Sequence, residues 1–334
     1  MNTHAPKHAG VDADSFDTAS SGSFVVVHDP VRAPAGLAQA VVAIGNFDGV
    51  HRGHAAVVAR AKTLARRLGR PCVVLTFEPH PADFFAGRSV VFRLTPEPAK
   101  AAALARLGLD GMIVLRFNKA LASLSAEEFI ADILVERLSA AAVVVGYDFH
   151  FGRRRQGTPA YLADAARRHG FAVEVVEEIK TDAAGSLEAV HSTAARTALE
   201  QGDVHEAARL LGHHWFVTGV VEHGEKRGRA LGFPTANIRL DPSCRLRHGI
   251  YAVRVRFDGG EHDGVASFGS RPTFDEGPPL LEIFIFDFAG DLYGKTMEVG
   301  FVGWLRPEEK FDGVRPLVAQ MRKDAERARE MLSG

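Results

Sequence analysis

The stretch Val41-Val42-Ala43-Ile44-Gly45-Asn46-Phe47-Asp48-Gly49-Val50-His51-Arg52-Gly53-His54 decides the fold of the first half of this chain. Four apolar residues at its start predict a buried strand, and a helical repeat of apolar side chains follows it as far as Gly69. Between them lies a glycine-rich loop that leads into a helix N-terminus, where free N–H groups bind anions. His51 and His54 can both donate to phosphate oxygens, so the loop predicts a site that stabilises departing pyrophosphate. The alternative is a plain glycine-rich turn with two surface histidines.

Short apolar runs alternate with helical patterns from this loop to about residue 180. Besides the run at 41–44, the sequence predicts strands at 72–77, 112–115, 142–145 and 173–176. Strands that alternate with helices predict an α/β domain, Rossmann-like, with a parallel sheet covered on both faces. Ligands bind at the carboxyl ends of such strands, so the loops that follow them are the expected site.

The character of the sequence changes after Gly212. Strand patterns separated by glycine-rich turns occur at 215–221, 251–257, 264–268, 281–288 and 297–301, and a final helix is expected from about 312 to 332. This half predicts an antiparallel β-barrel or sandwich with a terminal helix. We expect a disordered tail at 1–22, a first domain at 23–201, a helical linker at 202–214 and a second domain at 215–334.

Composition excludes several classes of protein. The 334 residues carry 40 Lys plus Arg against 41 Asp plus Glu, a net charge of −1, without the basic excess of a sequence-independent nucleic-acid binder. No apolar run approaches the roughly 18 residues that span a bilayer. Two cysteines, Cys72 and Cys244, exclude a disulfide framework and favour a reducing cytoplasm. We therefore expect small-molecule substrates, no nucleic acid and no membrane, and the sequence leaves a weak homo-oligomer open.

A second motif, Gly224 to Asn237, is a glycine-rich basic loop. Thr235 and Asn237 are two residues apart, so on an extended chain they face the same side. A hydroxyl and an amide oxygen are hard ligands that suit Mg²⁺ together with ATP phosphates. The alternative is a hairpin loop with a solvated basic tip.

These motifs carry a resemblance to a known family. The loop at 45–54 resembles the signature of the bacterial bifunctional riboflavin kinase/FAD synthetases, whose first domain is an H-x-G-H nucleotidyltransferase. The segment 75–81 is similar to the family's segment near the flavin, 145–157 to its second nucleotide motif, and Ser192, Thr193 and Arg196 to its third. The loop at 224–237 resembles the phosphate-and-metal loop of the kinase, with further signatures at 249–253, 269–274 and 291–295. The resemblance covers nearly everything from residue 24 to the end.

The resemblance implies two ATP-dependent reactions: riboflavin is phosphorylated to FMN, and FMN is adenylylated to FAD with release of pyrophosphate. It implies these nucleotide contacts in the first domain: Gly45, Phe47, Asp48, Gly49, Gly53, Asp148, Ser192, Thr193 and Arg196. In the second domain it implies Gly224, Lys226, Arg229, Gly232, Pro234, Thr235 and Arg271, with Mg²⁺ on Thr235 and Asn237. The attacking phosphate of FMN is already anionic, so adenylylation needs charge neutralisation and alignment rather than a general base.

Glu282 is the expected general base of the kinase, where the family's catalytic glutamate falls. It shares a strand face with Phe284 and Phe286, and desolvation among such neighbours is expected to raise its pKa. The riboflavin 5′-hydroxyl is a poor nucleophile, and a positioned carboxylate can take its proton as it attacks the γ-phosphate. The alternative is a glutamate paired with Arg254 or Arg271.

Two positions depart from the family pattern. His191 stands where the family usually has Ser, and Ala194 where it usually has Arg. They leave open a flavin-binding or regulatory module without catalysis, and Ser192-Thr193 also reads as a plain helix N-cap. A third alternative keeps catalysis but takes another acceptor, since H-x-G-H transferases also adenylylate pantetheine phosphate and nicotinamide mononucleotide.

Overall fold

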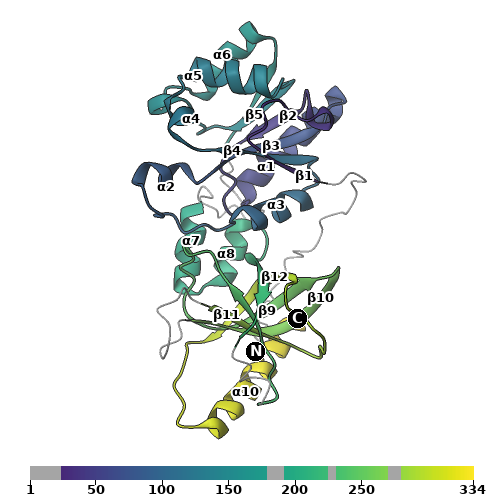
Figure 1. The fold of residues 1–334 in the computed structure, drawn as a ribbon, viewed down its shortest axis with the longest axis vertical. Helices are drawn as coiled ribbons and strands as arrows, with labels where there is room; N and C mark the ends of the chain where they lie inside the picture. The colour runs from purple at the N-terminus through teal and green to yellow at the C-terminus, as the bar shows by residue number, and fades with distance from the viewer. Residues whose placement is uncertain (1–23, 179–191, 225–230, 270–279) are drawn as a thin grey trace, which may run out of the picture.

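The computed structural model describes residues 24–178, 192–224, 231–269 and 280–334 (Figure 1). A parallel sheet with its helices lies at one end of the molecule and a barrel at the other, with helices α7 (Ser192–Gln201) and α8 (Val204–Leu211) between them. The expected tail at 1–22 lies outside the described residues, as do His191, Lys226, Arg229 and Arg271.

The first sheet has six strands, all parallel, in the order β1-β4-β3-β2-β5-β6. The strands are β1 (Val25–His28), β2 (Val41–Ile44), β3 (Cys72–Glu78), β4 (Gly111–Arg116), β5 (Ala142–Gly146) and β6 (Ala172–Val176). This confirms the predicted parallel sheet and its five predicted strands to within one residue at each end, whereas the edge strand β1 was not predicted. Because the chain proceeds from β2 to β3 on one side and returns to β5 on the other, the loops after β2 and β5 flank the point where strand order reverses.

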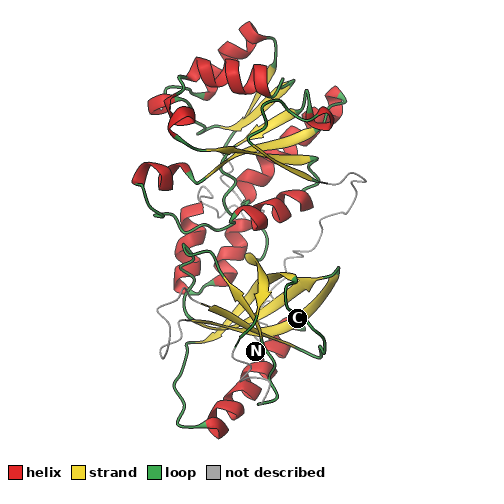
Figure 2. Ribbon diagram, in the orientation of Figure 1, coloured by secondary structure: helices red, strands yellow, loops and turns green. Residues whose placement is uncertain are grey.

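Alternate residues of each strand point to opposite faces of this sheet, and helices cover both faces (Figure 2). Helices α1 (Arg52–Leu68) and α3 (Glu97–Arg106) contribute to the core on one face. On the other face lie α5 (Ala126–Glu128), the π-helical segment η2 (Phe129–Arg137) and α6 (Pro159–His169). Full coverage explains why β2 is a run of four buried apolar residues rather than an alternating one.

Local sequence signals end and begin these helices as expected. Gly69 ends α1 in the left-handed conformation at φ 61°, and Ser125 with Glu128 forms a capping box at the start of α5. Thr158 caps α6 through its side chain, and Gly170 ends it. The sequence analysis did not predict the remaining short elements: η1 (Ala35–Leu37), α2 (Pro81–Ala86), α4 (Lys119–Ser123), η3 (Arg153–Arg155) and also α3.

The second half is a closed antiparallel barrel in the order β10-β11-β8-β7-β12-β9. Its strands are β7 (Phe216–Glu222), β8 (Ala236–Arg239), β9 (Gly249–Phe257), β10 (Gly260–Gly269), β11 (Leu280–Ile285) and β12 (Thr296–Arg306). The structure therefore selects the barrel from the two expected architectures. Strand β8 was missed, because the sequence was interpreted there as the end of a loop.

Helix α10 (Val314–Leu332) covers the outside of the barrel, packing Ala328 and Leu332 against Ala252 and Val302. It begins two residues later than expected. Val314, its first residue, is 57% exposed and takes no part in this packing.

The two halves share one continuous buried cluster. Phe92 and Leu94 from the first half pack with α7, α8 and the barrel residue Trp215. No helix in the described ranges is both long enough and apolar enough to cross a membrane.

Candidate functional site

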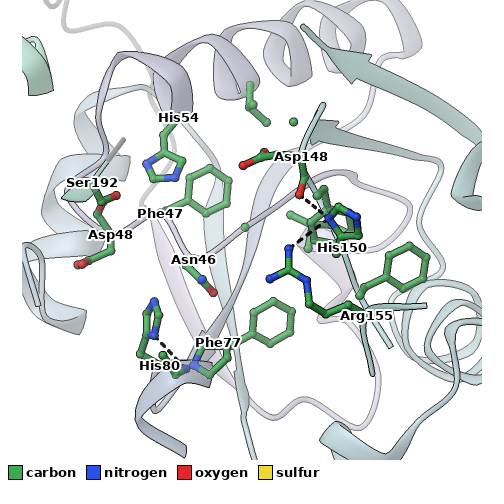
Figure 3. A pocket seen from close by; sticks show the side chains of 18 of the residues that line it. Asn46, Phe47, Asp48, His54, Phe77, His80, Asp148, His150, Arg155 and Ser192 are labelled. Carbon is green, nitrogen blue, oxygen red and sulfur yellow. Dashed lines mark hydrogen bonds between the residues drawn. The ribbon is translucent and has the colours of Figure 1, made fainter. Parts of the chain in front are cut away.

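A cavity of about 1000 Å³ opens at the carboxyl ends of β2 and β5, where the sheet topology predicts a ligand site. One wall is the loop at 45–54, and the opposite wall is the segment 146–155 (Figure 3). Helix α7 closes it with its first turn. The predicted residues that line the cavity are Gly45, Phe47, Asp48, His51, Gly53, His54, Asp148, Ser192, Thr193 and Arg196.

The loop after β2 is backbone-strained. Phe47, Gly49 and Val50 all have positive φ, at 48°, 84° and 42°. Such conformations cost about 1–3 kcal/mol each for residues other than glycine and persist only where their surroundings hold them. A β-branched valine there is a particular outlier, so the loop must be fixed by its contacts.

Asp48 fixes much of this loop from beneath. Its side chain is 2% exposed and accepts backbone hydrogen bonds from Leu94 at 3.2 Å and Thr95 at 2.9 Å. It also pairs with the Arg196 guanidinium at 2.5 Å. These donors let Asp48 orient the loop and Arg196. Asp48 also lines the cavity, so its expected contact with the nucleotide stays a prediction.

Gly49, also expected to contact the nucleotide, does not line the cavity. Its N–H donates to Thr95 Oγ1 at 2.8 Å, and an added Cβ would lie 2.7 Å from Leu94 Cδ1. Together with its positive φ, this close approach explains the glycine as a requirement of the turn.

The two histidines stand together at the start of α1. His51 caps the helix, its Nδ1 accepting from the backbone N–H of His54 at 3.3 Å, and the rings stack with centroids 3.7 Å apart. The Nδ1 of His54 is shielded from solvent and has no hydrogen-bond partner among the described residues. Burial, then the neighbouring His51 and Lys100, hold the pKa of His54 well below 6.5. His54 is therefore neutral at pH 7 and donates from one ring nitrogen only, and it is not the surface histidine of the alternative interpretation.

Helix α7 reaches the loop through two side chains. Ser192 donates its hydroxyl to the carbonyl of Asp48 at 2.9 Å, and Arg196 donates Nε–H to the carbonyl of Phe92 at 2.7 Å. Ser192 is the first residue of α7, and its hydroxyl bonds the loop at 45–54. This hydrogen bond connects α7 to the cavity wall.

The opposite wall carries positive charge beside Asp148. His150 contacts the carbonyl of Asp148 through Nδ1 at 2.8 Å, and Arg155 approaches the same nitrogen at 3.3 Å (Figure 3). Arg153 and Arg154 also line this side, so the mouth between the walls suits an anion.

An aromatic wall completes the cavity, and most of it was missed from the sequence. Its members are Phe77, Phe85, Phe117, Phe129, Phe149 and Phe151. Phe85 is 71% exposed and packs edge-on against Phe117, with ring centroids 5.7 Å apart. Flat apolar faces of this kind suit a planar ring system. These phenylalanines come from five different elements and loops, so no local pattern marks them as a group.

Buried charges lie behind the loop. Glu78 makes a bidentate pair with Arg93 and accepts from Lys100 Nζ at 3.0 Å. Burial raises the pKa of Glu78, but the bonds from Arg93 and the charge of Lys100 outweigh it, so the pKa falls below its ordinary value. Lys100 also lies 3.3 Å from Thr76 Oγ1, which donates to the carbonyl of Asn46 in the loop. The network thus connects α3 to the cavity.

The barrel brings Asn237 and Glu282 together as neighbours across β8 and β11. Asn237 is 6% exposed, and its Oδ1 is shielded from solvent, with no hydrogen-bond partner within the described ranges. An added Cβ at Gly224 would lie 2.2 Å from the Asn237 amide nitrogen, so only glycine fits there. Glu282 and Phe284 share the predicted strand face, and Phe284 packs on Phe233 with ring centroids 5.0 Å apart.

Other charges surround Glu282. Burial raises the pKa of Glu308, and the negative charge of Glu282 adds to this effect. The two carboxylates therefore repel each other. Arg254, the alternative partner of Glu282, lies 3.7 Å from Asp263. Of the other expected kinase residues, Gly232, Pro234 and Thr235 precede β8, while Lys226, Arg229 and Arg271 lie outside the described residues.

Comparisons with known proteins agree with this geometry. A family model described as FAD synthetase matches residues 34–192, and one described as Riboflavin kinase matches residues 211–332. A bifunctional riboflavin kinase/FMN adenylyltransferase of Listeria monocytogenes is 41% identical over 86% of this chain and 91% of its own. The Haemophilus influenzae protein of the same name is 41% identical over 86% and 92%. A crystal structure from Streptococcus pneumoniae described as Macrolide-efflux Protein has 31% identity and a TM-score of 0.76, covering 92% of this chain and 99% of that one.

A parallel sheet with an H-x-G-H loop at its switch point, joined to a closed antiparallel barrel, defines a nucleotidyltransferase fused to a second enzymatic domain. The chain belongs to the family of bifunctional riboflavin kinase/FMN adenylyltransferases.

Proposed function

We propose that this chain converts riboflavin to FMN at the barrel and FMN to FAD in the cavity of the parallel sheet, using ATP at both sites. Residues 23–201 carry the adenylylation and 215–334 the kinase reaction, with 202–214 as the linker. The observation that carries the first assignment is the stacked His51–His54 pair at a helix N-terminus, facing a cavity with an aromatic wall.

In the adenylylation, a phosphate oxygen of FMN attacks the α-phosphorus of ATP, and the bond to the β-phosphate breaks to release pyrophosphate. The nucleophile is already an anion, so the site supplies donors and alignment instead of a base. Neutral His54 donates one hydrogen bond, the N-terminus of α1 offers its N–H groups, and Arg196 adds positive charge. Asp48 and Ser192 hold these groups in place.

In the kinase reaction, the riboflavin 5′-hydroxyl attacks the γ-phosphorus of ATP, and ADP leaves. Glu282 takes the hydroxyl proton as the oxygen–phosphorus bond forms. Its position beside Asn237 puts the base next to the residues that would hold the phosphates.

Thr235 and Asn237 fit a bound Mg²⁺. Asn237 Oδ1 is buried and has no hydrogen-bond partner in the described part of the chain, which is the condition expected of a ligand oxygen. When bound, the ion would neutralise phosphate charge at the site of transfer. We infer a cytoplasmic location from Cys72 and Cys244, which are both free thiols.

The test is a time course with riboflavin, ATP and Mg²⁺, in which FMN appears first and FAD follows. Flavin that binds without ATP turnover would instead support the non-catalytic module. Failure with FMN combined with turnover of pantetheine phosphate or nicotinamide mononucleotide would support the other acceptors.

A further inference from the structure

Besides its own Val50-to-Phe47 hydrogen bond, the strained turn at 47–50 is held by side chains from distant parts of the chain. Thr95 bonds the carbonyl of Phe47 and the N–H of Gly49, at 3.3 and 2.8 Å. Ser192 donates its hydroxyl to the carbonyl of Asp48 at 2.9 Å. The carbonyl of Gly49 faces a more distant partner, His213 Nε2, at 3.1 Å.

His213 lies beyond α8, in the last residues before the barrel begins. Two further contacts join the C-terminal end of α8 to the start of α1. Arg52, the first residue of α1, donates Nε–H to the carbonyl of Arg209 at 3.1 Å, and an added Cβ at Gly212 would lie 2.9 Å from Arg52 Cγ. The stretch 209–213 therefore packs directly against the residues that present His51 and His54.

We propose that His213 is a positioning residue for FMN adenylylation, which holds the Gly49 carbonyl and thereby the turn that presents the histidine pair. The proposal rests on the proposed function of the cavity. It assigns part of the adenylylation machinery to the linker, outside the domain that contains the reaction.

The ring of His213 has two carbonyl neighbours. Nδ1 faces the carbonyl of His214 at 2.9 Å, and Nε2 faces that of Gly49. Burial lowers the pKa of His213, so at neutral pH the ring carries one proton and donates to one of them. Our proposal requires the proton on Nε2.

Two substitutions distinguish the nitrogens. His213→Gln places an amide N–H₂ near the position of Nε2, whereas His213→Asn places one near Nδ1 and does not reach Gly49. We expect His213→Asn to lower kcat for FAD formation from supplied FMN by about 10–100-fold, the scale of a small misplacement of reacting groups. KM for FMN should stay near that of the wild type, because the aromatic wall is not part of the turn. His213→Gln should recover most of the rate.

Phosphorylation of riboflavin by the same preparations is the internal control, because the kinase residues lie on the barrel, and it should be unchanged in both variants. The proposal is overturned if Asn and Gln impair adenylylation equally, if Asn alone preserves it, if neither changes it, or if kinase activity falls in parallel. A wild-type protein that forms no FAD from FMN would instead reject the proposed function itself, and the role of His213 with it.

Discussion

The cavity of the parallel sheet and the proposed kinase site on the barrel differ in how their polar side chains are bonded. Around the cavity, the strained turn at 47–50 is bound by Thr95, Ser192 and His213, and charged groups lie buried behind it. On the barrel, Glu282 and Asn237 are neighbours on two adjacent strands, and the Asn237 amide oxygen has no hydrogen-bond partner among the residues that the structure describes. The difference matches the nucleophiles. An anionic phosphate needs fixed donors, whereas an alcohol needs a base and a cation that arrives with the nucleotide.

The largest expected effect comes from removing the general base of the kinase site, Glu282. Glu282→Gln keeps the size of the side chain but cannot accept a proton, so FMN formation should fall by about 10²–10⁴-fold. Supplied FMN should still become FAD at the wild-type rate. Both rates are measured by separating flavins after a timed reaction, and a parallel loss of FAD formation would show that the two sites are not independent.

The reciprocal change removes a donor from the cavity. His54→Ala should lower FAD formation by about 10²–10³-fold, the usual cost of one missing donor in such a site, and FMN should accumulate. Because His54 is neutral, its role is hydrogen bonding rather than charge. His54→Gln is therefore the matched control and should lose distinctly less than the alanine variant. Equal losses in both would contradict this assignment.

The loop at 45–54 could be predicted because its information is local. A buried strand, a glycine-rich turn and a helix start occupy fourteen consecutive residues, and each follows from spacing and residue type. The same holds for Glu282, which was placed on its strand face by simple alternation.

What could not be predicted depends on contacts distant in sequence. Asp48 was expected in the phosphate loop from its place in the motif, but its hydrogen bonds to residues 94, 95 and 196, which anchor that loop, were not. The contact of His213 with Gly49 spans 164 positions, and nothing near either residue signals it. The aromatic wall was missed for the same reason, because only the fold gathers its members.

The next prediction concerns the buried side-chain oxygen of Asn237 on the barrel. Asn237→Ala removes one proposed ligand, so half-maximal kinase activity should require about 10-fold more Mg²⁺. The measurement is FMN formation against Mg²⁺ concentration at fixed ATP. Adenylylation of FMN by the same variant, whose site is elsewhere, should keep its Mg²⁺ dependence. A lower maximal rate with an unchanged Mg²⁺ curve would mean that Asn237 orients substrate and does not bind the ion.

The smallest expected effect is on folding and follows from the buried histidines on the cavity side. Burial lowers the pKa of His54, His80 and His213 below the ordinary value of 6.5, so the unfolded chain binds more protons than the folded one at mildly acidic pH. The stability that their neutral forms contribute is fully present above pH 6.5 and is lost as the pH falls through that value.

Each such histidine removes about 1.4 kcal/mol of unfolding free energy per pH unit below this point, until its own folded pKa is reached. Urea unfolding of the wild type at pH 7.5 and 5.5 measures the total. His54→Gln has no proton to take up at this position, so its loss between the two pH values should be smaller by about 1 kcal/mol. The comparison uses the difference within each protein, which removes any change in absolute stability caused by the substitution. An identical pH dependence in both proteins would show that folding leaves the pKa of His54 unchanged, which would contradict the burial effect assigned to it.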